Sequence, residues 1–241
     1  MINNIMMNKA LRLESRFSLP PNSLGYCGKN SAAFKFKECI INGNCKGIKQ
    51  EVKNFIVLNP YLEFLSKITG KPKFSYQIIE GYWIGNPILK KIKPQDYFLL
   101  LKYFRKQGVP DFFIEELKEK LPIKFIPNHL FQVLHVGVGK ASGAVLFNVK
   151  TINNCMIRWG KIQSFSQNTV VLNLNSLKPN GENKYKLTIL KETVSYNKEI
   201  TGALKISDTV AVHWGMAIKK LTKIEEKKIK YWTDEVIKLT F

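Results

Sequence analysis

Cysteine is scarce in this chain of 241 residues. The four cysteines are Cys27, Cys39, Cys45 and Cys155, and no Cys-x-x-Cys pair occurs among them. Their spacing therefore excludes the common structural zinc patterns. Two disulfides could form, but a chain of this size does not need them to hold a core, and in a reducing compartment all four residues would be free thiols.

Long hydrophobic runs are also missing. No run of about eighteen apolar residues occurs, so the sequence predicts no transmembrane helix. The segment Met1–Leu13 lacks an apolar core followed by a small-residue cleavage site. We therefore expect no signal peptide and a cytoplasmic protein. The chain is 45% hydrophobic and 12% aromatic, which is enough to build a buried core.

Acidic residues are few: 18 acidic side chains stand against 38 basic ones, for a net charge of +20. One interpretation is an acidic partner or a nucleic acid. Another is an AT-rich coding sequence, because only four of the basic residues are arginine and lysine, asparagine and isoleucine are abundant. Such a bias adds lysine without a functional demand, although it does not explain the shortage of acids. Both interpretations stay open.

Residues 1–145 are predicted to form a mainly α-helical domain. Apolar residues recur there at helical spacing, and the segments are bounded by proline, glycine and Asn-Gly signals. The predicted helices are a segment starting at Asn30 or Ser31 and ending at Asn42-Gly43, then Ile48–Ile56, Pro60–Ile68, Phe74–Trp83, a helix from Pro94 to Gly108, and one from Pro110 to Leu121.

In residues 150–241 the hydrophobic periodicity changes from helical to strand-like, and this part is predicted to form a small barrel. Short β-rich runs joined by turns favour an OB-like antiparallel β-barrel, and Thr222 with Glu225 forms a capping box for a terminal helix. The fold class is therefore α+β, with the domain boundary within about ten residues of Gly137–Gly143. The predicted strands are Met156–Phe165, Thr169–Leu177, Lys184–Tyr196 and Asp208–Ile218.

Two motifs bracket this barrel, Cys155–Ile162 (CMIRWGKI) and Asp208–Ile218 (DTVAVHWGMAI). Their order and spacing, with strands between them and a helix after them, resemble the HypC and HupF family of chaperones for NiFe hydrogenase maturation. The resemblance covers Cys155 to about Leu239, a little over a third of the chain. Members of that family have a cysteine near the start of the barrel and a Val-His-x-Gly-x-Ala segment near its end.

The resemblance implies a role in metallocentre assembly rather than catalysis. Cys155 corresponds to the iron-ligating cysteine and His213 to the histidine beside it. The implied cargo is a transient iron carrying cyanide and carbon monoxide, Fe(CN)2CO. The implied partners are a HypD-like scaffold protein and a hydrogenase large-subunit precursor. A thiolate is a soft ligand suited to such iron, and Arg158 could add positive potential.

Three positions depart from the family pattern. The cysteine is internal instead of following the initiator methionine, so no free α-amino group lies beside it. Trp159 stands where the family has proline, and Ser207 stands where it has glycine before Asp208.

The first half resembles, more faintly, an uncharacterised family that carries such a barrel at its C-terminus. The segments that carry this resemblance are Ser18–Gly28, Gly81–Asn86 and His129–His135. They supply a second set of candidate metal ligands: Cys27, His129 and His135. Each candidate also has an ordinary structural explanation, as a packed buried cysteine or a hydrogen-bonded core histidine.

Two other functions stay open from the sequence. OB-like barrels bind single-stranded nucleic acid on aromatic platforms, and Trp159, Phe165 and Trp214 are candidates for such platforms. Cys27 lies before a helix N-terminus, so with a distant His213 it also resembles the layout of a cysteine hydrolase. No Asn or Asp can be assigned to orient the histidine.

Overall fold

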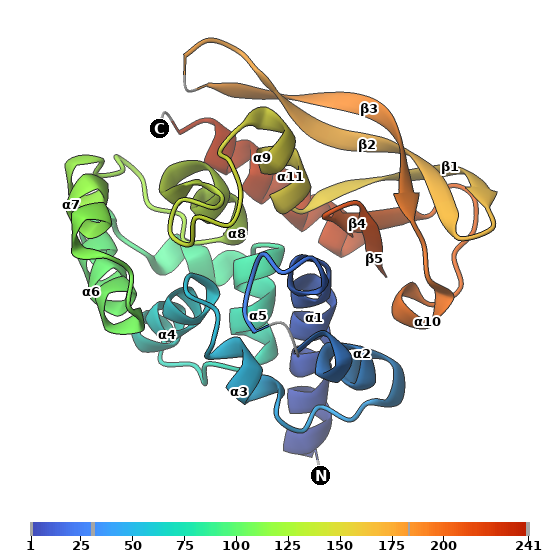
Figure 1. Cartoon of the computed structure of the whole chain (residues 1–241), viewed down its shortest axis with the longest axis horizontal. Coiled ribbons are helices and arrows are strands. Elements are labelled where there is room, and N and C mark those ends of the chain that lie inside the picture. The colour runs from blue at the N-terminus through green and yellow to red at the C-terminus, as the bar shows by residue number, and fades with distance from the viewer. Residues whose placement is uncertain (1, 30–31, 183, 240–241) are drawn as a thin grey trace.

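Helices fill the first part of the chain and a five-stranded sheet the second, which confirms the predicted α+β class (Figure 1). The computed structural model describes residues 2–29, 32–182 and 184–239. The first part contains α1 (Ile2–Ser23), α2 (Ala32–Asn42), α3 (Ile48–Val52), α4 (Leu58–Thr69), α5 (Tyr76–Trp83), the 3-10 helices η1 (Pro87–Lys91) and η2 (Pro94–Asp96), α6 (Tyr97–Gln107), α7 (Asp111–Glu119), α8 (His129–Phe131), the π-helix η3 (Gln132–Gly137) and α9 (Val149–Cys155). The second part contains β1 (Arg158–Ser166), β2 (Thr169–Pro179), β3 (Tyr185–Ser195), α10 (Lys198–Thr201), β4 (Thr209–His213), β5 (Met216–Lys220) and α11 (Lys223–Ile237).

Glycine ends two of the predicted helices where expected. Gly70 after α4 and Gly108 after α6 adopt φ of 68° and 94°, the left-handed conformation that closes a helix. The capping box of Thr222 and Glu225 opens α11 as predicted. The expected start of the second helix, at Asn30 or Ser31, lies outside the described residues.

The longest helix, α1, was not predicted. Its apolar residues show only weak helical periodicity, and it contains Pro20 and Pro21, which normally interrupt a helix. Both prolines lie in its last turn, and their carbonyls accept hydrogen bonds from Leu24 and Tyr26 beyond the helix end. α1 packs against α2 and α5, and it buries Phe17 and Leu19 completely. Tertiary packing therefore outweighs its weak local signal.

The five strands close into a small barrel, as predicted, although one of its pairings is parallel. β1 pairs antiparallel with both β2 and β4, while β2 pairs with β3 and β4 with β5. One parallel pair, Ser195 with Met216, joins β3 to β5, so the order β1-β2-β3-β5-β4 closes on itself. The barrel interior is filled by the buried residues Ile162, Val170, Leu172, Leu174, Val194, Val210, Val212 and Ala217.

The prediction of a single strand over Asp208–Ile218 is wrong, because the segment forms two strands. Trp214 and Gly215 adopt φ of 48° and 72°, and the chain reverses there between β4 and β5. Two adjacent residues with positive φ make a tight hairpin turn that matches the twist of the flanking strands. The alternation of Val210, Val212 and Trp214 concealed this turn, because tryptophan rarely adopts a positive φ.

The helical part and the barrel share one large hydrophobic core, which extends from Ala10 in α1 to Val236 in α11. At one contact the Trp232 ring of α11 lies on Gly85, just after α5, where an added Cβ would come within 2.3 Å of the ring. Gly85 also has φ of 87°. The motif Gly81–Asn86 therefore includes a glycine that the terminal helix requires.

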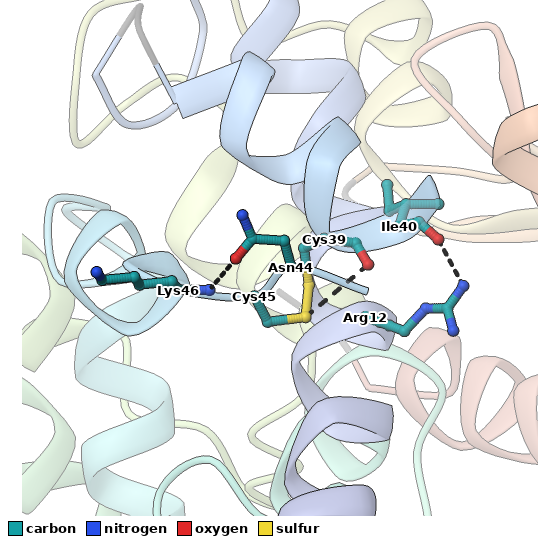
Figure 2. Close-up of a disulfide and its surroundings, with 6 residues drawn as sticks. All are labelled: Arg12, Cys39, Ile40, Asn44, Cys45 and Lys46. Carbon is teal, nitrogen blue, oxygen red and sulfur yellow. Dashed lines mark hydrogen bonds between the residues drawn. A yellow bond between two sulfur atoms is a disulfide. The ribbon is translucent and has the colours of Figure 1, made fainter. Parts of the chain in front are cut away.

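Cys39 and Cys45 form a disulfide across the turn that follows α2 (Figure 2). Cys39 is fully buried, and beside it Arg12 of α1 donates a 2.6 Å hydrogen bond to the Ile40 carbonyl. Free thiols at these two positions are therefore not what the structure shows. Cys27 and Cys155 are free thiols and form no disulfide.

Across the described parts of the chain, no helix combines the length and the apolar character needed to cross a membrane.

Candidate metal-binding site

Three separate elements bring the site residues together. His129 is the first residue of α8, where the Asn128 side chain caps the helix by accepting from the Phe131 N–H at 2.9 Å. Cys155 is the last residue of α9, and His213 is the last residue of β4. The Trp214 N–H donates to the carbonyl of Asn154, next to Cys155, at 2.8 Å. This bond holds the end of β4 against the end of α9.

The side chains of His129, Cys155 and His213 converge, with one ligand atom of each within 4.8 Å of the others. All three residues are buried. The structure thus brings together both residues of the first prediction and one residue of the second set. Sequence reasoning had no signal for this grouping, because His129 is separated from Cys155 by 26 residues.

The hydrogen bonds of His129 define its tautomer. Its Nε2 lies 2.8 Å from the Cys155 carbonyl oxygen, which can only accept. Nε2 therefore carries the proton, and Nδ1 accepts from the Tyr82 hydroxyl at 3.1 Å. The Cys155 Sγ lies 3.8 Å from the same Nε2.

His213 has the opposite tautomer. Its Nδ1 donates to the Phe17 carbonyl at 2.7 Å, so Nε2 is left with a free lone pair. Nε2 is buried and has no hydrogen-bond partner among the described residues. A ring held through Nδ1–H by a backbone carbonyl, with Nε2 unpartnered, is the arrangement found in metal-ligating histidines.

Burial keeps the cluster uncharged. It lowers the pKa of His129 to about 4 and the pKa of His213 well below its usual value, the latter with a contribution from His129. The Phe17 carbonyl, which accepts from Nδ1, acts in the opposite direction on the His213 pKa, as does the Cys155 carbonyl, which lies near the ring without meeting hydrogen-bond geometry at Nε2. Burial also raises the pKa of the Cys155 thiol well above its usual range, and the Trp214 indole partly offsets this.

A cavity of about 390 Å³ opens beside the cluster. Cys27 lines it together with the three cluster residues, and its other walls include Tyr82, Trp214 and the small-residue segment 137–145. Burial raises the pKa of Cys27 to about 11. The cavity therefore holds two thiols and two imidazoles.

Trp83 separates the cluster from a buried carboxyl group. Its ring centroid lies 4.5 Å from that of His129 and 5.7 Å from that of His213. Its Nε1 donates to Glu14 at 2.8 Å, and Ser18 Oγ donates to the other Glu14 oxygen at 2.6 Å. Burial raises the pKa of Glu14 to about 7 despite these two bonds. Glu14 was not among the predicted site residues, because nothing in the sequence indicates that this carboxyl is buried.

Two predicted residues lie elsewhere. His135 hydrogen-bonds the Tyr97 hydroxyl at 2.9 Å and stacks on Phe131, apart from the cluster. Arg158 is buried in an ion pair with Glu192 at 2.6 Å and is not a wall of the cavity. The prediction that Arg158 adds positive potential at the site is therefore wrong, because Glu192 of β3 neutralises its charge.

The structure also bears on the two other functions. Of the three aromatic candidates for nucleic-acid stacking, Trp159 is buried and Trp214 packs on Tyr26 at the cavity, so only Phe165 is exposed. A hydrolase would need a thiolate and an oriented base. The raised pKa of Cys27 and the bonding of His213 to a backbone carbonyl supply neither.

The donor set fits a soft or borderline metal ion. Two neutral imidazoles and one thiol match the ligands that iron and zinc accept, and a bound cation would stabilise the thiolate that burial alone disfavours. For His129 to ligate through Nε2, its hydrogen bond to the Cys155 carbonyl must break. His213 needs no such change, because its Nε2 is already unpartnered.

The fold and the cluster define an α+β protein in which helices and a small barrel enclose a His–Cys–His group beside a cavity. The chain belongs to DUF6390, a family of unknown function whose model matches residues 7–241. No curated protein and no solved structure matches it.

Proposed function

We propose that the protein is an accessory factor in metallocentre assembly that holds an iron unit at Cys155 and His213, with His129 as a third ligand and Cys27 as a thiol within the same cavity. The pathway that we propose is NiFe hydrogenase maturation, as the resemblance of the barrel to the HypC and HupF chaperones implies. The protein would act through protein contacts and iron handling, without catalysing a reaction of its own.

One observation carries the metal-binding part of this proposal: the buried, unpartnered Nε2 of His213 beside the Cys155 thiol and the His129 ring. Burying a polar nitrogen without a partner costs about 1–3 kcal/mol. A metal ion would remove that cost and would also stabilise the thiolate. A structural histidine in a core would instead have both nitrogens satisfied, as His129 does.

The position of Cys155 differs from that in the resembled family, and this bears on how cargo is handled. Cys155 is 6% exposed, at the end of a helix, instead of standing free at a chain terminus. The segment 137–145, which lines the cavity, contains Gly137, Gly139 and Gly143 with positive φ. We propose that loading and release pass this small-residue segment, which offers little side-chain bulk to displace.

The proposed partners are a HypD-like scaffold protein and a hydrogenase large-subunit precursor. The test is an anaerobic pull-down from the native cell, comparing the wild type with Cys155→Ser, followed by mass spectrometry and infrared spectroscopy of the eluate. His135→Gln is the matched control, because it alters a buried histidine outside the cluster.

We expect one of the two partners to co-elute with the wild type and with His135→Gln. Cyanide and carbonyl stretching bands should accompany both proteins and disappear in Cys155→Ser. Elution of only RNA or ribosomal proteins, equally from all three, would contradict the proposal. Iron without those bands, lost in Cys155→Ser, would keep the metal site and overturn the assignment to NiFe hydrogenases.

A further inference from the structure

A second concave site lies on the other side of α1, between the start of α5 and the junction of β5 with α11. The groove has a volume of about 670 Å³, a size typical of small-molecule sites. Its walls include Lys9, Arg12, Arg16, Tyr76, Lys219 and Glu225. Neither the resemblance nor the metal cluster accounts for this groove.

Lys9, Arg12 and Arg16 place three positive charges along one face of α1, because residues three and four positions apart lie on the same side of a helix. The chain has only four arginines, and two of them line this groove. A general excess of lysine in the sequence therefore does not explain the choice of side chains. Arginine binds phosphate oxygens through paired N–H groups, which lysine cannot do.

Both arginines are held in place by the protein. Arg12 Nη2 donates to the Ile40 carbonyl at 2.6 Å, and Arg16 Nη1 donates to the Ile218 carbonyl at 3.3 Å. Each guanidinium has further N–H groups that these bonds do not use. The two side chains are thus fixed while part of their donor capacity remains available.

No carboxylate within the described residues neutralises these three cations, since neither arginine nor Lys9 forms an ion pair there. Glu225 lies in the groove but is already bound by Lys219 at 2.7 Å and by the Thr222 N–H at 3.0 Å. Burial, and then the charge of Arg12, lower the pKa of Arg16 to about 10. The groove therefore carries unbalanced positive charge.

We propose that this groove binds the polyphosphate chain of a small molecule. With a rise of 1.5 Å per residue, Lys9 and Arg16 are about 10 Å apart along α1, which suits a chain of two or three phosphates. A single phosphate would contact only part of the row formed by Lys9, Arg12 and Arg16. The limited volume of the groove favours a small molecule over a nucleic-acid strand.

Isothermal titration calorimetry of the full chain tests this proposal, with inorganic tripolyphosphate, inorganic phosphate and a single-stranded oligonucleotide as separate probes. The variants are Arg12→Gln and Arg16→Gln. Arg105→Gln is the control for charge, since exposed Arg105 pairs with Asp111 and Glu115 far from the groove. Arg16→Lys retains the charge, and circular dichroism melting checks that each variant folds.

We expect tripolyphosphate to bind more tightly than phosphate, and each groove substitution to weaken tripolyphosphate binding about tenfold or more, because each removes charged hydrogen bonds to the phosphates. Arg105→Gln should change binding less than twofold, and Arg16→Lys should restore part of the affinity. Cys155→Ser should bind like the wild type, which separates this result from the metal site. No saturable tripolyphosphate binding, equal loss in Arg105→Gln, or tight binding of the oligonucleotide alone would overturn the proposal.

Discussion

At the scale of single residues, the two histidines of the cluster are held in different states. His129 has both ring nitrogens engaged, by Tyr82 and by the Cys155 carbonyl, whereas His213 has only Nδ1 engaged. Burial disfavours the imidazolium form of both rings. At neutral pH both imidazoles are therefore uncharged and able to act as ligands.

Ser207 shows how a single position links sequence to backbone geometry. It adopts φ of 70°, a left-handed conformation that favours glycine. The resembled family has glycine at this point. A serine in place of glycine at this position therefore adds local backbone strain. The turn into β4 is kept, since the Ser207 N–H donates to the Ile162 carbonyl at 3.0 Å.

Glu14 gives a prediction about pH. Its pKa is raised in the folded state to about 7 from 4.5, so its contribution to stability is fully present below pH 4.5 and is lost as pH rises through 7. The Glu14→Gln substitution removes the titrating group, so the variant does not lose this stability as the pH rises. The free energy of unfolding of the variant, relative to wild type, should therefore rise between pH 5 and pH 8 by up to about 3 kcal/mol.

Urea unfolding at a series of pH values measures this difference, with exposed Glu199→Gln as the matched control. The buried histidines lower stability below pH 6.5 in all three proteins, so their effect cancels in the comparison. A difference between Glu14→Gln and wild type that does not change with pH would show that Glu14 is not protonated on burial.

At the scale of elements, the predictable parts were those with local signals. Glycine caps, the capping box of α11 and the β-rich runs that form β2 and β3 were all visible in the sequence. The Trp214–Gly215 turn was missed because alternation continues through it. The helix α1 was missed because its helical periodicity is weak and its last turn contains two prolines. In both cases the determining contacts are tertiary, and periodicity does not report them.

The disulfide at the end of α2 gives a prediction at this scale. Closing the short loop between Cys39 and Cys45 removes chain entropy from the unfolded state, for a contribution of about 2 kcal/mol. Cys45→Ala should lower the free energy of unfolding by about that amount. A reductant should destabilise the wild type to the same level and leave Cys45→Ala unchanged, as measured by thermal melting. Equal melting of wild type with and without reductant would contradict the bridge.

At the scale of the whole molecule, the helical part and the barrel act as one unit around the site. His129 comes from the helical part, Cys155 from the helix that leads into the barrel, and His213 from the barrel itself. The sequence predicted two of these residues through a resemblance limited to the barrel. It could not predict their grouping with His129, because that depends on how α8 packs against α9 and β4.

The shared core explains why the site needs both parts of the chain. α1 supplies the Phe17 carbonyl that orients His213, and α5 supplies the Tyr82 hydroxyl that bonds His129. The family match over residues 7–241 likewise extends across both parts. A barrel without its helices would lack His129 and the backbone group that holds His213.

The most direct test of the central claim is an anaerobic titration of the purified protein with Co²⁺, a spectroscopic substitute for divalent iron, with proton release measured in parallel. We predict one equivalent bound with a thiolate-to-metal absorption band and release of the thiol proton, since a ligating cysteine must deprotonate. Cys155→Ser should abolish the band, and His213→Gln should weaken binding about tenfold or more, as loss of a ligand exceeds the 10–100-fold effect of losing a ligand's partner. His135→Gln should bind like the wild type. Binding that is absent, or that is unchanged in Cys155→Ser, would contradict the account and leave the cluster as a part of the core.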